Sequence, residues 1–367
     1  MALFFRSKKK TPKQLCEDLR MLVLYPERFA IVPGKDGGKR RLSDDKGEDV
    51  ADAPIDKRLE ALKNALCFDE EKYKPEERNA IGKYLIDVDE SGDSRVPLYL
   101  CLVEHLGSLE FESRKNVASI INALVLHNLG NFKATLLANE CYALRSLLAA
   151  LVRAHHDSSY AIIAGAVLRD VLSLQEATKY FLCHTELMKP FFELYLVSKD
   201  YGVVSDAFIT LRDLLSTHKQ IVSAHLENHF DSFFDLYNSL LKSTEYFTKR
   251  ASLKLLSELL LDRQNFNVMI KYISSAENLK LVMMLLRVTA EKIQLEAFHV
   301  FKVFVANPYK AAPVHSILYS NKEKILAFLK SMGEKDKQDE QFAEEIDLLI
   351  RKLSALGPEP AKLKPKA

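Results

Sequence analysis

The sequence predicts an all-α protein, an armadillo/HEAT-like right-handed helical repeat solenoid. Of its 367 residues, 48% are hydrophobic and 28% are charged, with only 12 Gly and 12 Pro. This balance favours long helices over turn-rich sheets, and strand-type alternation of polar and apolar residues is scarce. The chain also exceeds the size at which one globular core keeps growing, so several domains or one repeat array is expected, and the composition favours the array.

An internal repeat is the strongest evidence for this fold class. Five helical segments align at a reference position, taken as offset zero, which is Val117, Ala164, Ala207, Ser252 and Ala297. The separations are 47, 43, 45 and 45 residues, within the roughly 40–47 residues of armadillo and HEAT repeats. Offsets +1, +3, +4, +7 and +8 are mostly apolar and form one broad arc of a helix. Stacking on neighbouring repeats buries such an arc, so we expect a curved rod with a continuous core.

Polar residues recur at two other offsets of the same segments. Offset +5 is Asn122, Arg169, Arg212, Ser257 and Lys302 in the five copies, and offset +6 in the three middle copies is Asp170, Asp213 and Glu258. Two interpretations stay open. These side chains form rungs on a surface that an extended partner contacts, or they bond to one another between repeats and hold the register.

Four segments follow from composition and periodicity. We expect an N-terminal helical segment at 1–32 and an armadillo-like repeat domain at 55–356. Between them, residues 33–54 are rich in Gly, Asp and Lys without apolar periodicity, which predicts a disordered loop insertion. The basic, proline-containing tail at 357–367 is expected to be disordered as well.

Charge and cysteine content restrict the classes of partner and compartment. The chain has 52 basic and 50 acidic residues, a net charge of +2, which argues against nucleic acid and against an anionic membrane surface as general partners. No apolar run reaches the length of a membrane span. The five cysteines are an odd number, widely spaced in apolar helical stretches, which is typical of reduced thiols in the core and predicts a cytoplasmic protein.

Motifs for catalysis and cofactor binding are missing. The sequence contains neither phosphate-binding glycine loop, G-x-x-x-x-G-K-[ST] or G-x-G-x-x-G, and no G-x-S-x-G, H-E-x-x-H or paired C-x-x-C motif. We therefore predict that the protein is not an enzyme and has no catalytic residues and no cofactor.

Two segments partly match metal-binding motifs, and we interpret both as ordinary loop and helix-end features without a metal. Residues 87–92 copy the first half of a calcium loop, but Leu98 stands where a bidentate Glu belongs, which favours a solvated acidic loop. His155 and His156 precede Asp157, yet consecutive helical residues point about 100° apart and do not chelate together. A helix end with cationic side chains is the simpler interpretation. No metal is predicted.

The C-terminal half resembles a known family. The segments SDAFITLRDLLSTHK, YFTKRASLKLLSELLLDRQNF, ENLKLVMMLLR and IQLEAFHVFKVFVANP, between Ser205 and Asn307, are similar to the family of mouse protein 25, also called calcium-binding protein 39. The resemblance is looser over 13–200, where FESRKNVASIINALV carries it, and the insertion at 34–52 is not typical of the family.

The resemblance implies an armadillo-like scaffold without enzymatic activity. Members hold, in a concave surface, the kinase domain of sterile-20-type kinases or of the STRAD pseudokinase and stabilise its active conformation. In animals a third kinase joins the complex, and in fungi relatives serve NDR kinase pathways of polarity and cell separation.

The resemblance also implies partner-binding residues in the repeat helices. The family's contacting Arg and Lys match Arg250 and Lys254, preceded by the aromatic Tyr246. Their four-residue spacing places both cations on one side of a helix, away from the leucines of the apolar arc. Tyr201 falls where the family has a contacting Phe, and so retains the ring and adds a hydroxyl.

Two further pairs of residues are carried over in the same way. Arg263 and Phe266 match positions that touch the third kinase of the animal complex. Lys280 and Met283 match the pocket for a C-terminal Trp-Glu-Phe-type peptide of the pseudokinase. A methionine beside a cation is typical of a site for an aromatic and acidic peptide, but Met283 lies in a leucine stripe and could equally be a core residue.

The leading hypothesis is therefore a scaffold that binds and activates a sterile-20-type kinase or pseudokinase in signalling for cell polarity, morphogenesis or cell division. The alternative is a passive helical-repeat adaptor or cytoskeletal assembly factor that recruits partners without activating them. Both predict binding, and only activity measured with and without the scaffold separates them.

Overall fold

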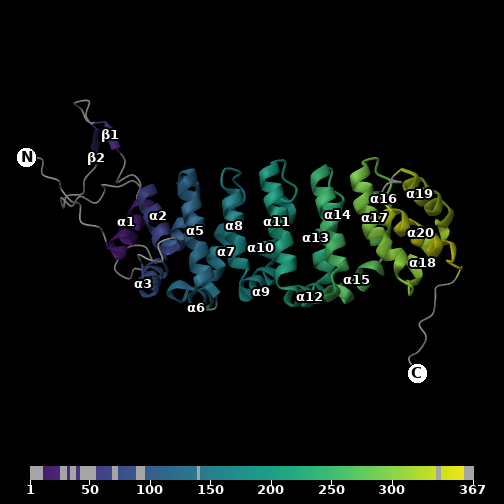
Figure 1. The fold of residues 1–367 in the computed structure, drawn as a ribbon, viewed down its shortest axis with the longest axis horizontal. Coiled ribbons are helices and arrows are strands. Elements are labelled where there is room, and N and C mark those ends of the chain that lie inside the picture. The colour runs from purple at the N-terminus through teal and green to yellow at the C-terminus, as the bar shows by residue number, and fades with distance from the viewer. Residues whose placement is uncertain are drawn as a thin grey trace, which may run out of the picture. The chain divides into compact units, whose positions relative to one another are not determined.

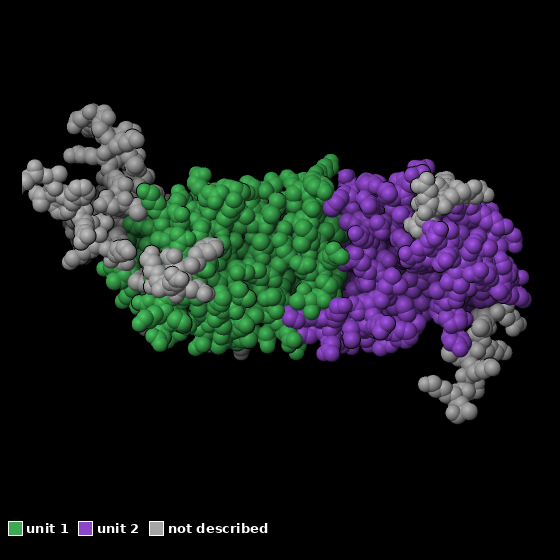
Figure 2. All heavy atoms as spheres, in the orientation of Figure 1, with its two compact units in different colours: residues 1–217 green, residues 218–367 purple. Residues whose placement is uncertain are grey.

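A computed structural model describes most of the chain, and the described residues fall into two compact units, Met1–Thr217 and His218–Ala367 (Figures 1 and 2). Each unit has its own packed helices and its own apolar core. The described residues are 11–24, 31–33, 39–41, 55–67, 73–87, 96–138, 141–335 and 340–358.

Unit 1 alternates long repeat helices with shorter connecting ones (Figure 1). In chain order it contains α1 (Pro12–Leu24), β1 (Ile31–Pro33), β2 (Lys39–Arg41), α2 (Ile55–Cys67), α3 (Pro75–Ile86), α4 (Leu98–Glu104), η2 (Leu106–Ser108), α5 (Phe111–His127), η3 (Leu129–Asn131), α6 (Phe132–Leu137), α7 (Tyr142–Ala154), α8 (Ala161–Leu172), α9 (Gln175–Cys183), α10 (Thr185–Pro190), the π-helical η5 (Phe191–Tyr195) and α11 (Tyr201–Thr217).

Unit 2 follows the same alternation of long and short helices. It contains α12 (Lys219–Asn228), α13 (Phe230–Leu241), α14 (Tyr246–Leu261), η6 (Arg263–Asn265), α15 (Phe266–Ile273), α16 (Ala276–Leu285), α17 (Glu291–Ala306), α18 (Ala312–Ser320), α19 (Lys322–Lys335) and α20 (Glu340–Ser354).

The predicted repeat is confirmed. The five reference positions lie inside α5, α8, α11, α14 and α17, which we call the repeat helices, and all five side chains are fully buried. In unit 1, α5 packs against α8 and α8 against α11; in unit 2, α14 packs against α17 (Figure 1). The fold is therefore all-α and armadillo-like, apart from the β1–β2 pair among the described residues.

The apolar arc of each repeat helix forms the core, as the offsets predict. In α17 the phenylalanines Phe298, Phe301 and Phe304 are all buried, and the ring of Phe298 lies 5.1 Å from that of Phe342 in α20. Burying side chains of this size contributes on the order of 2 kcal/mol each, which is why the stacked helices of a unit hold together.

A buried polar cluster fixes the packing of α8 against α11 in unit 1. Asp206 of α11 is almost fully buried, and its carboxylate accepts a hydrogen bond from Arg169 of α8 at 2.9 Å. Arg169 also donates to the hydroxyl of Thr210 at 2.8 Å. A side chain at Gly165 would collide with the Asp206 carboxylate, so this position requires glycine. We call Gly165, Arg169, Asp206 and Thr210, together with His155, the polar cluster.

In unit 1, polar residues at offsets +5 and +6 bond between neighbouring repeat helices. Asn122 of α5 hydrogen-bonds the Asp170 carboxylate of α8, and Arg169 lies 3.9 Å from Asp213 of α11. Burial raises the pKa of Asp170, while Asn122 and Arg169 act in the opposite direction. The sequence left two interpretations of these polar residues open, a partner-contacting surface or bonds between repeats that hold the register. The contacts in unit 1 are of the second kind.

The structure corrects the prediction for His155. This residue follows the last residue of α7, as expected of a helix end, but it is fully buried rather than an exposed cation. Its Nδ1 lies 2.9 Å from the carbonyl oxygen of Leu151, and its Nε2 lies 3.4 Å from Oδ2 of Asp206 without forming a hydrogen bond. His155 therefore belongs to the α8–α11 packing, while His156 is exposed.

The predicted loop and tail lie largely outside the described residues. Where the loop at 33–54 begins, β1 and β2 pair antiparallel with Ile31 opposite Arg41. This hairpin was not predicted, because the segment lacks the alternation that signals strands. Of the tail at 357–367, the structure describes only the first two residues, and residues 88–95 of the calcium-like loop are also outside it.

The cysteines agree with the core prediction at two of five positions. Cys16 and Cys101 are buried, and burial raises the pKa of the Cys16 thiol to about 12, which leaves it protonated and unreactive. Cys67 and Cys141 are half-buried, and Cys183 is exposed, contrary to the prediction. In the described part of the chain, no single helix has both the length and the apolarity to cross a membrane, and one bent pair, Leu129–Leu137 with Tyr142–Ala154, meets that test only jointly.

Candidate functional site

One side of every repeat helix is accessible to solvent. Its residues stand at offsets −6, −2, +2 and +9, which fall on one side of a helix at 100° per residue. Offsets −6 and +9 are exposed in all five copies, and offsets −2 and +2 are exposed or half-buried. We call these four positions the exposed stripe. The sequence spacing alone places these four offsets on the side of each helix opposite the apolar arc.

Three of the predicted partner-binding residues occupy the exposed stripe of α14 in unit 2. Tyr246, Arg250 and Lys254 stand at offsets −6, −2 and +2, and all three are exposed. The Arg250 guanidinium lies 3.8 Å from a carboxylate oxygen of Glu296 in α17, too far for a strong ion pair. Among the described residues, no carboxylate lies within ion-pair distance of Lys254. The stripe of α14 therefore presents positive charge beside an aromatic ring.

Arg263 and Phe266 lie at the turn after α14, not on the stripe. Asp262 organises this turn, because its carboxylate accepts a hydrogen bond from the backbone N–H of Gln264 at 3.0 Å and forms an ion pair with Lys219 at 2.6 Å. These contacts, led by that with Lys219, lower the pKa of Asp262. The turn leaves Arg263 and the ring of Phe266, the first residue of α15, exposed to solvent.

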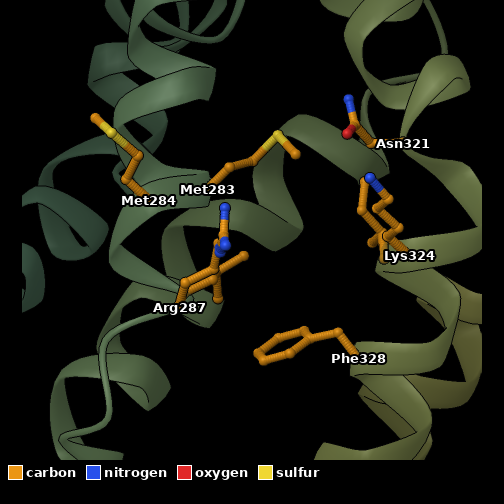
Figure 3. A pocket seen from close by; sticks show the side chains of 8 residues that line it. Met283, Met284, Arg287, Asn321, Lys324 and Phe328 are labelled. Atoms are coloured by element: carbon orange, nitrogen blue, oxygen red, sulfur yellow. The ribbon is translucent and has the colours of Figure 1, made fainter.

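Met283 lines a pocket in unit 2 rather than the core (Figure 3). The pocket has a volume of about 520 Å³, and Met283 is half-buried in its wall. Arg287 comes from the same wall, while Lys324 and Phe328 come from α19 on the opposite one (Figure 3). We call it the methionine pocket, and it is lined by Met283, Met284, Leu286, Arg287, Asn321, Lys324, Ile325 and Phe328.

Lys280 does not line the methionine pocket. Its ammonium pairs with Glu277 at 2.8 Å, three residues earlier on α16, and it lines a neighbouring hollow of about 660 Å³ with residues of α13 and α15. Met284 lines both cavities. The cations of the methionine pocket are Arg287, which lies in the turn after α16 four residues beyond Met283, and Lys324, which lies about forty residues further along the chain and has no local sequence signal.

Tyr201 belongs to unit 1, whereas the other predicted site residues belong to unit 2. It is the first residue of α11, at offset −6, and 68% of its side chain is exposed. The side chain of Ile162 in α8 lies 3.7 Å from the position that a Cβ would take on Gly202, the next residue. Tyr201 is thus accessible, and Ile162 lies next to the residue that follows it.

The described residues offer no cluster for a metal ion. Within the described ranges, no group of three or more His, Cys, Asp or Glu side chains is arranged to hold one. The surfaces that the site residues form are suited to protein or peptide contacts, since they combine exposed rings, methionine and cations.

The chain is similar to known proteins of one family. The profile of the Mo25-like family matches residues 2–357. A human protein named calcium-binding protein 39-like is 39% identical over 312 residues, covering 85% of this chain and 89% of that protein. The Mo25-like protein of Schizosaccharomyces pombe is 42% identical over 255 residues, covering 70% and 76%.

Two further proteins are similar over a smaller share of this chain. The conidiophore development protein hymA of Emericella nidulans is 45% identical over 161 residues, covering 44% of this chain and 42% of that protein. Among solved structures, a designed armadillo repeat protein aligns with 67% of this chain and 99% of its own length, at 15% identity and a TM-score of 0.36.

Proposed function

The chain belongs to the Mo25-like family, and we propose that it is a non-catalytic cytoplasmic scaffold that binds and activates a sterile-20-type protein kinase or a STRAD-like pseudokinase. A third kinase or an NDR kinase pathway completes the proposed assembly. The name of the hymA relative, a conidiophore development protein, supports a place in morphogenesis, with polarity and cell division as related processes.

The exposed pair Arg250 and Lys254 on α14 is the observation that carries this proposal. Both cations are accessible, four residues apart, and weakly neutralised within the described chain. A helix or loop with acidic side chains could pair with both at once, and Tyr246 adds an aromatic ring one turn before them. Activation requires that these contacts form more tightly with the active conformation of the kinase than with the inactive one.

The methionine pocket supports a second contact, with an aromatic and acidic C-terminal peptide. Met283 and Phe328 offer an adaptable thioether and a ring to an aromatic side chain, while Arg287 and Lys324 offer charge to carboxylates. The volume of about 520 Å³ lies in the usual range for ligand sites, roughly 300–1,000 Å³. A Trp-Glu-Phe-type peptide combines these requirements.

One experiment distinguishes a scaffold that activates its kinase partner from one that only binds it. A purified sterile-20-type kinase of the same organism is assayed with and without the protein, and complex formation is followed by co-elution. We expect a stable complex and raised kinase activity. Arg250→Glu should weaken binding at least about tenfold, because it places a carboxylate where a partner carboxylate is expected. Lys330→Glu, an exposed lysine of α19 outside both surfaces, serves as the matched control.

The outcomes are distinct. Absence of both co-elution and activation contradicts the proposed function. A complex without any change in kinase activity instead supports the alternative of a passive adaptor or cytoskeletal assembly factor. Equal loss of binding in the Arg250 and Lys330 variants contradicts the role of α14.

The peptide contact is tested with a labelled peptide ending in Trp-Glu-Phe. Lys324→Glu should weaken binding by about tenfold, measured by fluorescence anisotropy, because a wall cation becomes an anion. Lys280→Glu should change it little, because Lys280 lines the other hollow. The reverse result, loss with Lys280→Glu alone, would place the peptide in that hollow.

A further inference from the structure

We propose that Glu296 of α17 is a further partner-binding residue in unit 2, which accepts a basic side chain of the kinase-domain partner beside the acidic one that Arg250 receives. The inference rests on the proposed function and deepens it, because it adds a charge of opposite sign to the same site. The family resemblance assigns no role to Glu296. Its position, its burial and its open acceptor oxygens support this one.

Glu296 lies next to the exposed stripe of α14. The two helices pack against each other within unit 2, and a carboxylate oxygen of Glu296 lies 3.8 Å from Nε of Arg250. Glu296 stands one position before the reference residue Ala297 of α17, whereas Arg250 and Lys254 stand on the stripe of α14. A partner group that pairs with Arg250 therefore comes close to the Glu296 carboxylate.

The Glu296 carboxylate is poorly hydrated and forms no hydrogen bond within the described part of the chain. Only 13% of its side chain is accessible, compared with 46% for Arg250. Among the described residues, Arg250 is the one cation within ion-pair distance, and its Nε is too far away to donate a hydrogen bond. The Glu296 oxygens still reach solvent, since neither is one of the sealed, unbonded polar atoms of the described chain. An acceptor thus stays open for a partner donor.

The other charged groups near Glu296 do not fill this acceptor. Lys302, six residues later on α17, donates to both carboxylate oxygens of Glu345 in α20, at 2.8 and 2.9 Å. Burial, and then Lys302, lower the pKa of the half-buried His299, so this ring is neutral near pH 7. Lys292, one turn before Glu296, is exposed and forms no ion pair within the described residues.

The surface therefore offers opposite charges side by side. A partner acid pairs with Arg250 and Lys254, while a partner Lys or Arg donates to Glu296 and replaces hydration that this carboxylate largely lacks. A neutral donor gains less, because a hydrogen bond is strengthened by charge on both groups. A segment with acids alone is repelled by Glu296. The chemistry selects a segment that carries an acidic and a basic side chain close together.

The test is Glu296→Gln, which keeps the shape and an acceptor oxygen but removes the charge. Binding of the purified sterile-20-type kinase should weaken about tenfold, because one charge-assisted contact is lost, and should depend less steeply on salt concentration. If Glu296 only neutralised Arg250, the same substitution would tighten binding, since the partner acid loses a repelling neighbour. Stability in urea should not fall, because no hydrogen bond of Glu296 within the described chain is broken.

Glu344→Gln is the matched control. Glu344 belongs to α20 of the same unit, is exposed, and lies outside the exposed stripe and both cavities. The substitution makes the same change in net charge away from the site, so kinase binding should equal that of the unaltered protein. An equal loss of binding in both variants would attribute the effect to net charge and overturn the inference.

The remaining results separate this inference from the proposed function. Failure of the unaltered protein to bind any sterile-20-type kinase of its organism overturns both. Binding that Arg250→Glu weakens but Glu296→Gln leaves unchanged or tightens overturns the inference alone. A loss of binding by Glu296→Gln that is matched by an equal loss of unfolding stability also overturns it, because the carboxylate then acts within the fold.

Discussion

Two joints between repeat helices use different chemistry for the same task. The α8–α11 joint of unit 1 contains the polar cluster, in which a nearly buried carboxylate is held by a guanidinium and a hydroxyl. The α14–α17 joint of unit 2 joins helices with leucine and phenylalanine arcs, and Arg250 meets Glu296 near its surface at 3.8 Å. Apolar arcs supply most of the driving force at both joints, but they specify relative position loosely.

The difference indicates which substitutions should destabilise each pair of helices. The polar cluster fixes one position of α11 on α8, because the carboxylate of Asp206 fills the space over Gly165. A buried ion pair adds little net stability compared with apolar packing, yet breaking it is costly. The stability of the α14–α17 joint in unit 2 should therefore depend on side-chain volume. The stability of the α8–α11 joint in unit 1 should depend on the buried charges and on the absence of a methyl group at Gly165.

The largest expected effect tests the apolar joint. Phe298→Ala removes a fully buried ring of α17 that also contacts Phe342 of α20, and should destabilise unit 2 by about 3–5 kcal/mol. Hydrogen exchange should show the lost protection concentrated in unit 2, with urea unfolding giving the magnitude. Equal loss of protection in both units would contradict the idea that each unit has its own core.

A smaller effect is expected at the polar joint. Gly165→Ala adds a methyl group against the Asp206 carboxylate, which must move away from Arg169, and should cost about 2–3 kcal/mol in urea unfolding. Gly333→Ala in α19 is the control, because the added methyl group meets only Ile346 side-chain atoms at 3.6 Å. There alanine should be neutral or stabilising by up to about 1 kcal/mol. A similar response to both substitutions would show that Asp206 does not restrict α8.

The smallest effect concerns pH, and it extends the comparison to one histidine in each unit. His155 faces a carboxylate, whereas His225 of α12 stacks on His229 with ring centroids 4.3 Å apart. Burial, and then the neighbouring His229, lower the pKa of His225 to about 4. Because the unfolded chain binds this proton at a higher pH, near 6.5, the stability contribution is present above about 6.5 and lost as pH falls toward 4.

His225→Gln should therefore flatten the dependence of stability on pH between about 6.5 and 4, by less than about 1 kcal/mol for this half-exposed ring. Urea unfolding at a series of pH values measures it. A variant that loses stability in acid as steeply as the unaltered protein would show that other groups dominate there.

The repeat could be predicted from sequence because it depends on local periodicity. The reference positions from Val117 to Ala297 needed only a common spacing, and all five are buried. The polar cluster could not be predicted in this way. Its members come from α8, α11 and the residue that follows α7, and nothing in the sequence around His155 indicates that a carboxylate 51 residues later faces it. The hairpin at 31–41 also lacked a local signal.

The candidate site was predictable where it lies within one helix. Arg250 and Lys254 share a helical face by spacing alone, and the structure leaves both exposed. The methionine pocket needed two helices to be brought together, so Lys324 and Phe328 were missed, and Lys280, which the resemblance pairs with Met283, lines a different cavity. Sequence spacing identifies faces, whereas a cavity depends on what packs opposite each face.

Met284 gives the two cavities of unit 2 a common wall. Its flexible side chain borders the methionine pocket on one side and the hollow lined by Lys280 on the other. A ligand that moved this thioether on binding in one cavity would change the lining of the other. Binding in the two cavities would then be coupled, and each ligand would change the affinity of the other by the same factor.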